Sequence, residues 1–188
     1  MKEKTLVLIK PDGVQRALIG EIIKRFETTG LKIIAMRMVY ASKELAGKHY
    51  AEDEEWLRSV GEKAAKAAQE RGDKLKETPI EFGRKIRNQL MDYIAMSPIV
   101  ALVLEGHNAV ATVRKLIGST SPEHAQPGTI RGDFSHESYV LADRKGRPIQ
   151  NLIHASGTPK EAEREIKVWF TPNELHAYMR VDESLMYR

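Results

Sequence analysis

The chain has 188 residues, no cysteine, and 30 basic against 26 acidic side chains, which gives a net charge of +4. The lack of cysteine excludes disulfides, thiolate nucleophiles and thiolate metal sites. No run of eighteen apolar residues occurs, and the N-terminus shows no secretory signal, so we expect a cytoplasmic protein that does not span a membrane. The mild positive excess would suit an anionic ligand.

The first predicted element is a strand at Thr5–Ile9, whose uninterrupted apolar run is typical of burial on both faces. Lys10-Pro11-Asp12-Gly13 follows as a turn signal, which places Lys10 at the mouth of that strand. Apolar residues at helical spacing come next and predict a helix. Residues 31–40 then predict a second strand, and residues 42–50 a short helix.

The next segment differs in composition, because residues 52–88 hold nine acidic and nine basic side chains. One apolar stripe at helical spacing begins at Trp56 and a second begins at Phe82. These stripes predict a pair of packed helices within residues 52–95. Since the charges of this pair cancel, we expect a solvated helical insertion and not a nucleic-acid surface.

A third apolar strand is predicted at Pro98–Leu104, and a helix that carries Arg114 follows it. Residues 118–134 are rich in Ser, Thr, Pro and Gly and predict a long loop. Loops of that length in compact domains are usually functional or disordered. A turn signal within residues 139–149, between short apolar pieces, predicts a hairpin.

The last predicted strand ends in Asn151-Leu152-Ile153-His154. Thr158-Pro159-Lys160-Glu161 then has the pattern of a helix N-cap, a first helical proline and a capping box. A second pattern of this kind, at Thr171–Glu174, predicts a final helix. The imidazole of His154 is therefore expected between a strand end and a capped helix, rigid yet open to a ligand.

The order of these elements predicts an α+β fold with a βαββαβ core. Such a core is a four-stranded antiparallel sheet, and we expect its helices over one face. No internal repeat or low-complexity linker interrupts the chain, so residues 1–188 are predicted to form a single domain.

Four motifs in this order resemble those of nucleoside diphosphate kinases. They are Leu8-Ile9-Lys10-Pro11-Asp12-Gly13-Val14, Gly20-Glu21-Ile22-Ile23-Lys24-Arg25-Phe26-Glu27, Pro127-Gly128-Thr129-Ile130-Arg131-Gly132-Asp133-Phe134 and Asn151-Leu152-Ile153-His154. The resemblance covers about three quarters of the chain. It fails at residues 52–88 and 138–149, which we interpret as an inserted helical pair and an inserted hairpin.

The resemblance implies a ferredoxin-like sandwich that assembles as a homo-oligomer, often a hexamer. It further implies that a γ-phosphoryl group passes from a nucleoside triphosphate to a nucleoside diphosphate by a ping-pong route through phosphohistidine, with Mg²⁺. By motif position, His154 would be the nucleophile, and Tyr50 and Glu165 would lie beside its imidazole. The nucleotide contacts would be Lys10, Arg114, Thr120, Arg131 and Asn151.

The chemistry of these residue types agrees with such roles. A neutral imidazole is a competent nucleophile near pH 7, provided that a partner on the other ring nitrogen fixes its tautomer. Glu165 and Glu161 are the candidate partners, and we choose Glu165 because the capping box occupies Glu161. Phosphoryl transfer needs positioning and charge stabilisation, which Lys10, Arg114 and Arg131 are expected to supply as fixed cations.

Two departures from the family pattern bear on the metal and on the base. The family generally carries an aspartate three residues after the histidine, where this chain has Gly157. We therefore expect no protein ligand for the metal, and Mg²⁺ that arrives with the nucleotide. The insertion falls where the family places its base-stacking aromatic, and both Trp56 and Phe82 remain candidates.

A second hypothesis is an RNA-binding module, because the same sandwich serves that role. It would need aromatic residues on an open face of the sheet, whereas the predicted strands carry aliphatic residues. No P-loop motif is present. The histidines other than His154 share no metal-ligand spacing, so we expect ordinary surface or packing roles for them; they are His49, His107, His124, His136 and His176.

Overall fold

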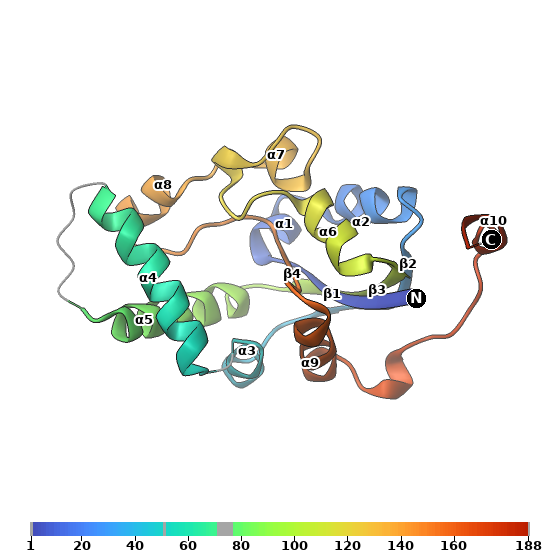
Figure 1. Ribbon diagram of the computed structural model, residues 1–188, viewed down its shortest axis with the longest axis horizontal. Coiled ribbons are helices and arrows are strands. Elements are labelled where there is room, and N and C mark those ends of the chain that lie inside the picture. The colour runs from blue at the N-terminus through green and yellow to red at the C-terminus, as the bar shows by residue number, and fades with distance from the viewer. Residues whose placement is uncertain (1, 51, 71–76, 188) are drawn as a thin grey trace.

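A computed structural model describes residues 2–50, 52–70 and 77–187, and Figure 1 shows the arrangement of its elements. Between the two predicted helices, the sequence Gly72-Asp73 is a turn signal, and it lies outside these residues. Four antiparallel strands form one sheet in the order β2-β3-β1-β4. The strands are β1 (Lys2–Ile9), β2 (Lys32–Val39), β3 (Ile99–His107) and β4 (Ile153–Ala155). The predicted α+β, ferredoxin-like fold is confirmed.

Helices occupy the connections between these strands and the chain beyond them. The α-helices of the described residues are α1 (Pro11–Gln15), α2 (Ile19–Thr28), α3 (Lys43–His49), α4 (Glu54–Glu70), α5 (Pro79–Ala95), α6 (Ala109–Ile117), α7 (Ile130–Phe134), α8 (Tyr139–Arg144), α9 (Pro159–Trp169) and α10 (Glu183–Met186). Two short 3₁₀ turns are η1 (Pro122–His124) and η2 (Pro172–Glu174). Within the described residues, no helix is long and apolar enough to cross a membrane.

The sheet is buried on both faces, which the expectation of helices over one face did not include. Successive side chains of a strand point to opposite faces, so Val7 and Ile9 pack with the residues of α2 and α6, whereas Leu6 and Leu8 pack with those of α3, α5 and α9. Figure 1 shows these two helical layers on either side of the sheet. The second layer exists because the insertion and the last long helix each contribute an apolar stripe, including the fully buried Trp169.

The predicted helical pair is present as α4 and α5, which lie together at one end of the molecule (Figure 1). Two glycines let their backbones touch. A Cβ on Gly61 would lie 1.7 Å from the Pro79 carbonyl oxygen, and a Cβ on Gly83 would lie 2.0 Å from that of Leu57. Thr78 caps α5 in a capping box. The pair is therefore joined through its backbones, and any larger side chain at either glycine would separate the helices.

Two predicted elements take other forms. Residues 139–149 contain helix α8 and not a hairpin, because Ser138 caps it by accepting a hydrogen bond from the Leu141 N–H at 3.1 Å. The expected final helix at Thr171 is only the turn η2, although its capping box is present. The chain then becomes extended, and the N–H of His176 donates to the Ile34 carbonyl at 2.8 Å. Pairing with the edge of β2 has thus replaced further helical turns.

Candidate active site

His154 is the central residue of β4, opposite Leu8 of β1, and its side chain is 22% exposed. Its Nε2 lies 3.1 Å from Oε2 of Glu165. Glu165 sits on the buried side of α9, so its carboxylate reaches back to the strand as the sequence predicts. A rigid strand and a packed helix therefore hold the imidazole and its partner together.

The charge of Glu165 decides which nitrogen of His154 is free. Ser156 donates its hydroxyl to Glu165 Oε2 at 2.7 Å and accepts from the Leu6 N–H at 3.3 Å. Burial raises the pKa of Glu165, but its hydrogen bonds to His154 and Ser156 and its electrostatic interactions with His154 and His49 outweigh burial and lower the pKa to about 2. An ionised carboxylate only accepts hydrogen bonds, so the proton is on Nε2 and the lone pair is on Nδ1.

Glu161, the rejected partner, is engaged elsewhere. Thr158 caps α9 by accepting from the Glu161 N–H at 3.1 Å. The Glu161 carboxylate accepts from the Gly157 N–H at 2.9 Å, one residue before the position that the predicted capping box requires. The choice of Glu165 over Glu161 for the contact to His154 is the one the structure supports.

Asp12 supports the strand that carries His154, a contact that the motif analysis missed. Leu152 has a left-handed φ of 68°, and its N–H donates to Asp12 Oδ2 at 2.9 Å. The Tyr93 hydroxyl donates to Asp12 Oδ1 at 2.5 Å. Burial, together with the negative charge of Asp12, raises the pKa of Tyr93, so Tyr93 stays a donor. The sequence signal that could have predicted this contact is the aspartate within the Lys10–Gly13 turn.

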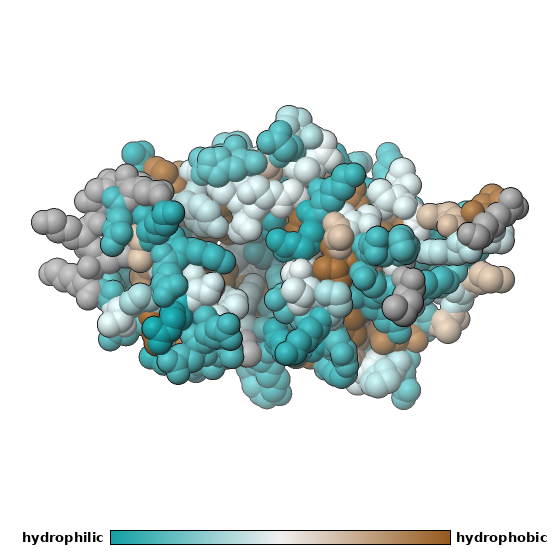
Figure 2. All heavy atoms as spheres, in the orientation of Figure 1, coloured by the Kyte–Doolittle hydropathy of each residue, from teal (hydrophilic) through white to brown (hydrophobic). Residues whose placement is uncertain are grey.

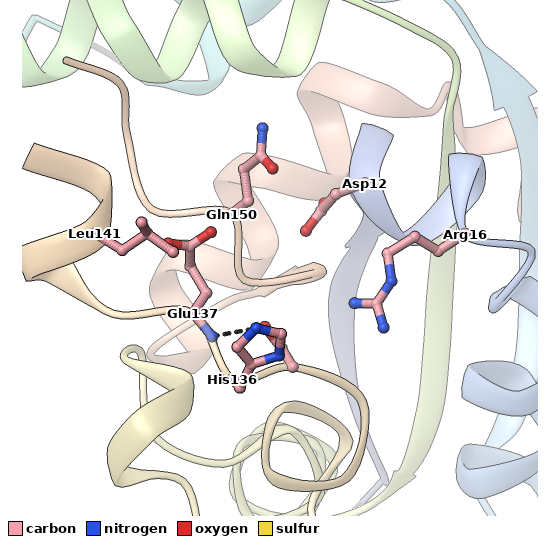
Figure 3. Close-up of a pocket in the computed structure, with 7 residues that line it drawn as sticks. Asp12, Arg16, His136, Glu137, Leu141 and Gln150 are labelled. Carbon is pink, nitrogen blue, oxygen red and sulfur yellow. Dashed lines mark hydrogen bonds between the residues drawn. The ribbon is translucent and has the colours of Figure 1, made fainter. Parts of the chain in front are cut away.

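Asp12 also lines a pocket of about 280 Å³ between α1 and residues 135–150. Figure 3 shows Asp12 and Arg16 on one side and His136, Glu137, Leu141 and Gln150 on the other. The residues that line it do not include His154 or Lys10. It is a neighbouring hollow, and we do not assign the nucleotide to it. Figure 2 shows a separate depression between α4 and the side of the molecule that carries α6 and α9.

Lys10 is buried, although the sequence predicts an open position at the mouth of the first strand. Its side chain is only 5% exposed, and Nζ donates to Asn151 Oδ1 at 2.8 Å. Burial and the nearby charge of Arg131 lower the pKa of Lys10 to about 7, against the opposing effect of Asp12. Asn151 in turn donates to the Thr120 carbonyl at 2.8 Å. Lys10 and Asn151 therefore form one buried pair beside His154 whose charge varies near neutral pH.

Arg131 lies in the first turn of α7 and not in a loop. Its guanidinium is buried and donates to the backbone carbonyls of Gly118, Ser119, Asn151 and Ile153. Burial and the charge of Arg114 lower its pKa to about 10. Arg131 thus fastens the 118–134 segment to β4, whereas Arg114 and Thr120 are exposed.

A series of aromatic rings extends outward from His154 through His49 and Tyr50 to Trp56. The ring packed on His154 is that of His49, with centroids 4.5 Å apart. Tyr50 packs on His49 at 4.6 Å, and burial raises the pKa of its phenol, which stays neutral. The ring centroids of Trp56 and Tyr50 are 6.5 Å apart. The Phe82 ring lies against the Lys85 ammonium, whose Nζ is 5.9 Å from the ring centroid. The sequence predicts a surface or packing role for His49, and its ring is packed against His154, Tyr50 and Trp169.

The residues around His154 do not fit a magnesium ion held by the protein. Mg²⁺ requires oxygen ligands in octahedral geometry. Both carboxylate oxygens of Asp12 accept hydrogen bonds, as does the Glu165 oxygen nearest His154. The cluster of metal-ligating types at this site is His49, His154 and Glu165, with ligand atoms within 4.8 Å of one another. Two imidazoles and one carboxylate suit softer ions than Mg²⁺.

The comparisons with known proteins all indicate the same family. The family model for nucleoside diphosphate kinase matches residues 3–57 and 80–175, which omits most of α4 but runs through α8. A curated relative, the nucleoside diphosphate kinase of Pyrobaculum aerophilum, is 52% identical over 178 residues, which are 92% of this chain and 97% of the relative.

Two solved structures resemble the fold over nearly its whole length. The NDP kinase of Pyrobaculum aerophilum superposes with a TM-score of 0.92 at 49% identity and covers 94% of this chain and 100% of its own. A transition state mimic of the Borrelia burgdorferi nucleoside-diphosphate kinase, with bound vanadate and ADP, gives a TM-score of 0.81 at 39% identity, with coverage of 99% and 97%. The chain therefore belongs to the nucleoside diphosphate kinase family, whose members transfer the γ-phosphoryl group of a nucleoside triphosphate to a nucleoside diphosphate.

Proposed function

We propose that this nucleoside diphosphate kinase carries the transferred phosphoryl group on Nδ1 of His154. The observation that carries the proposal is the contact of 3.1 Å between Nε2 and the ionised Glu165. A nucleophilic histidine needs one nitrogen free and the other bonded to a group that steadies the developing positive charge. The resemblance of the fold to a transition state mimic with vanadate and ADP supports the same chemistry.

The reaction then has two halves of the same kind. Nδ1 attacks the γ-phosphorus, the bond from that phosphorus to the bridging β–γ oxygen breaks, and the diphosphate leaves. The second diphosphate attacks the phosphohistidine through a terminal β-phosphate oxygen, and the N–P bond breaks. Glu165 stays ionised throughout and offsets the charge of the phosphorylated ring, so it orients the imidazole and does not attack.

The nucleotide would be held by residues on several sides of its phosphates. Arg114 and Thr120 are exposed and able to contact it directly. Lys10 and Asn151 would meet the phosphate nearest His154. Arg131 would add positive charge from behind the strand and keep the loop in place. Charge of this kind stabilises the phosphoryl group in transfer. Tyr50 would contribute a neutral phenol to the wall of the site.

The metal would enter as part of the substrate, as the complex of Mg²⁺ with the nucleoside triphosphate. The carboxylates near His154 are already engaged, and residue 157 is glycine. Phosphate oxygens and water would therefore supply the ligands. The protein contribution is to place the phosphates, while Mg²⁺ lowers their charge.

We also propose that residues 1–188 act as one domain, in the cytoplasm, within a homo-oligomer, which in the resembling family is often a hexamer. Exposed apolar residues on the edge strand β2 support self-association: Met36, Met38 and, just beyond the strand, Tyr40. Sedimentation velocity of the wild type and of Met38→Lys tests this, since a charge on an interface strand should reduce the assembly. A wild type that sediments as a monomer would contradict it.

The deciding experiment is transient labelling of His154. Incubation with γ-labelled ATP and Mg²⁺ should add one phosphate per chain, labile in acid and stable in alkali, and ADP should remove it. His154→Gln should abolish labelling and turnover while nucleotide affinity stays within twofold. The matched control is His124→Gln, an exposed histidine, which should behave as the wild type. Labelling of His154→Gln would overturn the assignment.

A further inference from the structure

His49, the last residue of α3, is a buried histidine in direct contact with His154. It is 2% exposed, and its ring stands at 87° to the His154 ring with centroids 4.5 Å apart. Tyr50 and Trp169 close the other sides, at 4.6 Å and 5.7 Å. This edge-to-face geometry is the arrangement that aromatic rings prefer. The His49 ring therefore forms one wall against which His154 rests.

The orientation of the His49 ring is itself fixed. The indole N–H of Trp169 donates to His49 Nδ1 at 3.2 Å. Indole nitrogen only donates, so Nδ1 carries the lone pair and the proton is on Nε2. In the described part of the chain that Nε2 has no hydrogen-bond partner. An unpaired buried N–H is costly. If packing were the only role of this position, a residue without a side-chain N–H would therefore suit it better than histidine.

Both rings lie near the carboxylate of Glu165, but only His154 is hydrogen-bonded to it. Glu165 Oε2 holds His154 Nε2 at 3.1 Å, and Glu165 Oε1 lies 4.0 Å from His49 Nδ1. The Nδ1 of His49 accepts its hydrogen from Trp169, so it makes no demand on Glu165. The charge of Glu165 is therefore left to the ring that becomes positive on phosphorylation.

We propose that His49 is a positioning residue for phosphoryl transfer: its ring, held by Trp169, keeps the His154 imidazole in the plane where Nε2 meets Glu165 and Nδ1 faces the ligand. The proposal rests on the function proposed above, in which His154 accepts the phosphoryl group. It adds a chain of contacts from α9, through the end of α3, to the reacting ring.

A soft metal ion bound by His49, His154 and Glu165 would be another use of the same atoms. The Trp169 N–H points at the lone pair that such an ion would need. An ion there would have to displace that donor and the His154–Glu165 contact together. The geometry therefore favours positioning, and zinc binding becomes an outcome that would overturn it.

Two substitutions separate the ring from the acceptor. His49→Asn keeps an acceptor for Trp169 but removes the wall, and His49→Phe restores a wall without the acceptor. We expect His49→Asn to slow single-turnover phosphorylation of His154 by roughly tenfold to a hundredfold, as misplacement of a reacting group does. ADP affinity should stay within twofold, and His49→Phe should recover most of the rate. A rate for His49→Asn within twofold of wild type, or a His49→Phe no faster than His49→Asn, overturns the proposal.

Measurements on the wild type keep the test independent of variant folding. Burial above all, with the neighbouring His154, Arg164 and Lys10, holds the pKa of His49 well below its usual value, against the opposing effect of Glu165. Nitrogen-15 NMR should thus show His49 neutral, with its proton on Nε2, from pH 6 to 8. Protonation in that range, or stoichiometric Zn²⁺ binding that His49→Phe abolishes, overturns it. If the wild type is never phosphorylated on His154, the proposed function fails; if only the His49 results fail, that function stands.

Discussion

The N–H of Leu152 donates to the carboxylate of Asp12 at 2.9 Å, and Leu152 holds a φ of 68° two residues before His154. A left-handed conformation costs a residue with a side chain roughly 1–2 kcal/mol. Leu152 is fully buried, and its carbonyl accepts from the Lys10 N–H at 2.8 Å. The turn after β1 therefore imposes the conformation that presents His154.

Replacing Asp12 by Ala should destabilise the fold and slow catalysis together. Two buried hydrogen bonds to a charged group are lost, and Leu152 loses its support, so we expect the free energy of unfolding to fall by about 3 kcal/mol. Urea unfolding and single-turnover labelling check this. The control is Asp92→Ala, which removes only an exposed ion pair with Lys43 and should change neither. An unchanged labelling rate for Asp12→Ala would refute the link to His154.

Glu165 should contribute stability that disappears in acid. Its folded pKa of about 2 lies below the ordinary value of 4.5, so the contribution is present above pH 4.5 and is lost as the pH falls toward 2. A depression of that size corresponds to about 3 kcal/mol at neutral pH. Glu165→Gln should flatten this acid limb and slow phosphorylation without abolishing it.

Stability measured from pH 2 to 7 by chemical unfolding compares Glu165→Gln with wild type. Glu163→Gln is the matched control on the same helix, because its ion pair with Lys167 is exposed. It should keep the wild-type acid limb. If both variants lose the limb equally, the buried contact to His154 is not its source.

Lys10 should make nucleotide affinity depend on pH above neutrality. Since its folded pKa is about 7, the free protein loses the ammonium as pH rises, and binding a phosphate must then take up a proton. Affinity for the Mg²⁺ complex of ADP should fall by up to about tenfold per pH unit above 7. Calorimetry from pH 6 to 9, in buffers of different ionisation enthalpy, measures both effects.

The lowered pKa of Lys10 also makes the stability of the fold depend on pH. Below pH 7 Lys10 is charged in both states and its burial is fully unfavourable, so stability should rise from pH 7 toward 10.5. Lys10→Gln should remove the proton uptake and this rise. Lys24→Gln, an exposed lysine of α2, should keep both. Proton uptake that persists in Lys10→Gln would assign it to another group.

The two glycines at the crossing of α4 and α5 should be intolerant of alanine. A methyl group at Gly61 or Gly83 would overlap a backbone carbonyl, so each change should cost roughly 1–3 kcal/mol. Gly20 is the control, since a Cβ there meets nothing within 4 Å, and Gly20→Ala in α2 should be neutral or stabilising. Hydrogen exchange of the α4 and α5 amides localises the effect. Equal protection in Gly61→Ala and wild type would contradict it.

Much of this fold was predictable because local patterns and tertiary structure agree. The run at Thr5–Ile9 is buried on both faces, and Thr158 begins its helix as a capping residue should. The hairpin expected at residues 139–149 was wrong for a local reason, since Ser138 caps α8, whereas a long-range contact decided the fate of the expected final helix. The final helix gave way to pairing between His176 and Ile34, and nothing in the local sequence reports that partner.

The candidate site shows the same difference between local patterns, which were predictable, and long-range contacts, which were not. The contact between His154 and Glu165, at 3.1 Å, was predictable because both residues lie on elements that the sequence defines. The state of Lys10 was not predictable, since its pKa depends on burial and on Arg131, which lies far along the chain. The contact between His49 and Trp169 was not predictable for a similar reason, because the two residues are 120 positions apart in the sequence.

Gly157 should leave the free protein almost without affinity for Mg²⁺. Where the family generally carries an aspartate, this chain has Gly157, which has no carboxylate. The Gly157 N–H instead donates to the Glu161 carboxylate at 2.9 Å. Calorimetry of Mg²⁺ into the nucleotide-free protein should show no stoichiometric binding.

Gly157→Asp should lower the Mg²⁺ concentration that gives half the maximal rate, because a carboxylate would then meet the ion or its water. A Cβ at Gly157 would approach the end of the Glu161 side chain at 2.8 Å, which can swing away. Gly157→Asn is the matched control, with the same shape and no charge, and should leave the Mg²⁺ requirement unchanged. Tight stoichiometric Mg²⁺ binding by the wild type without nucleotide would show that the protein itself holds the metal.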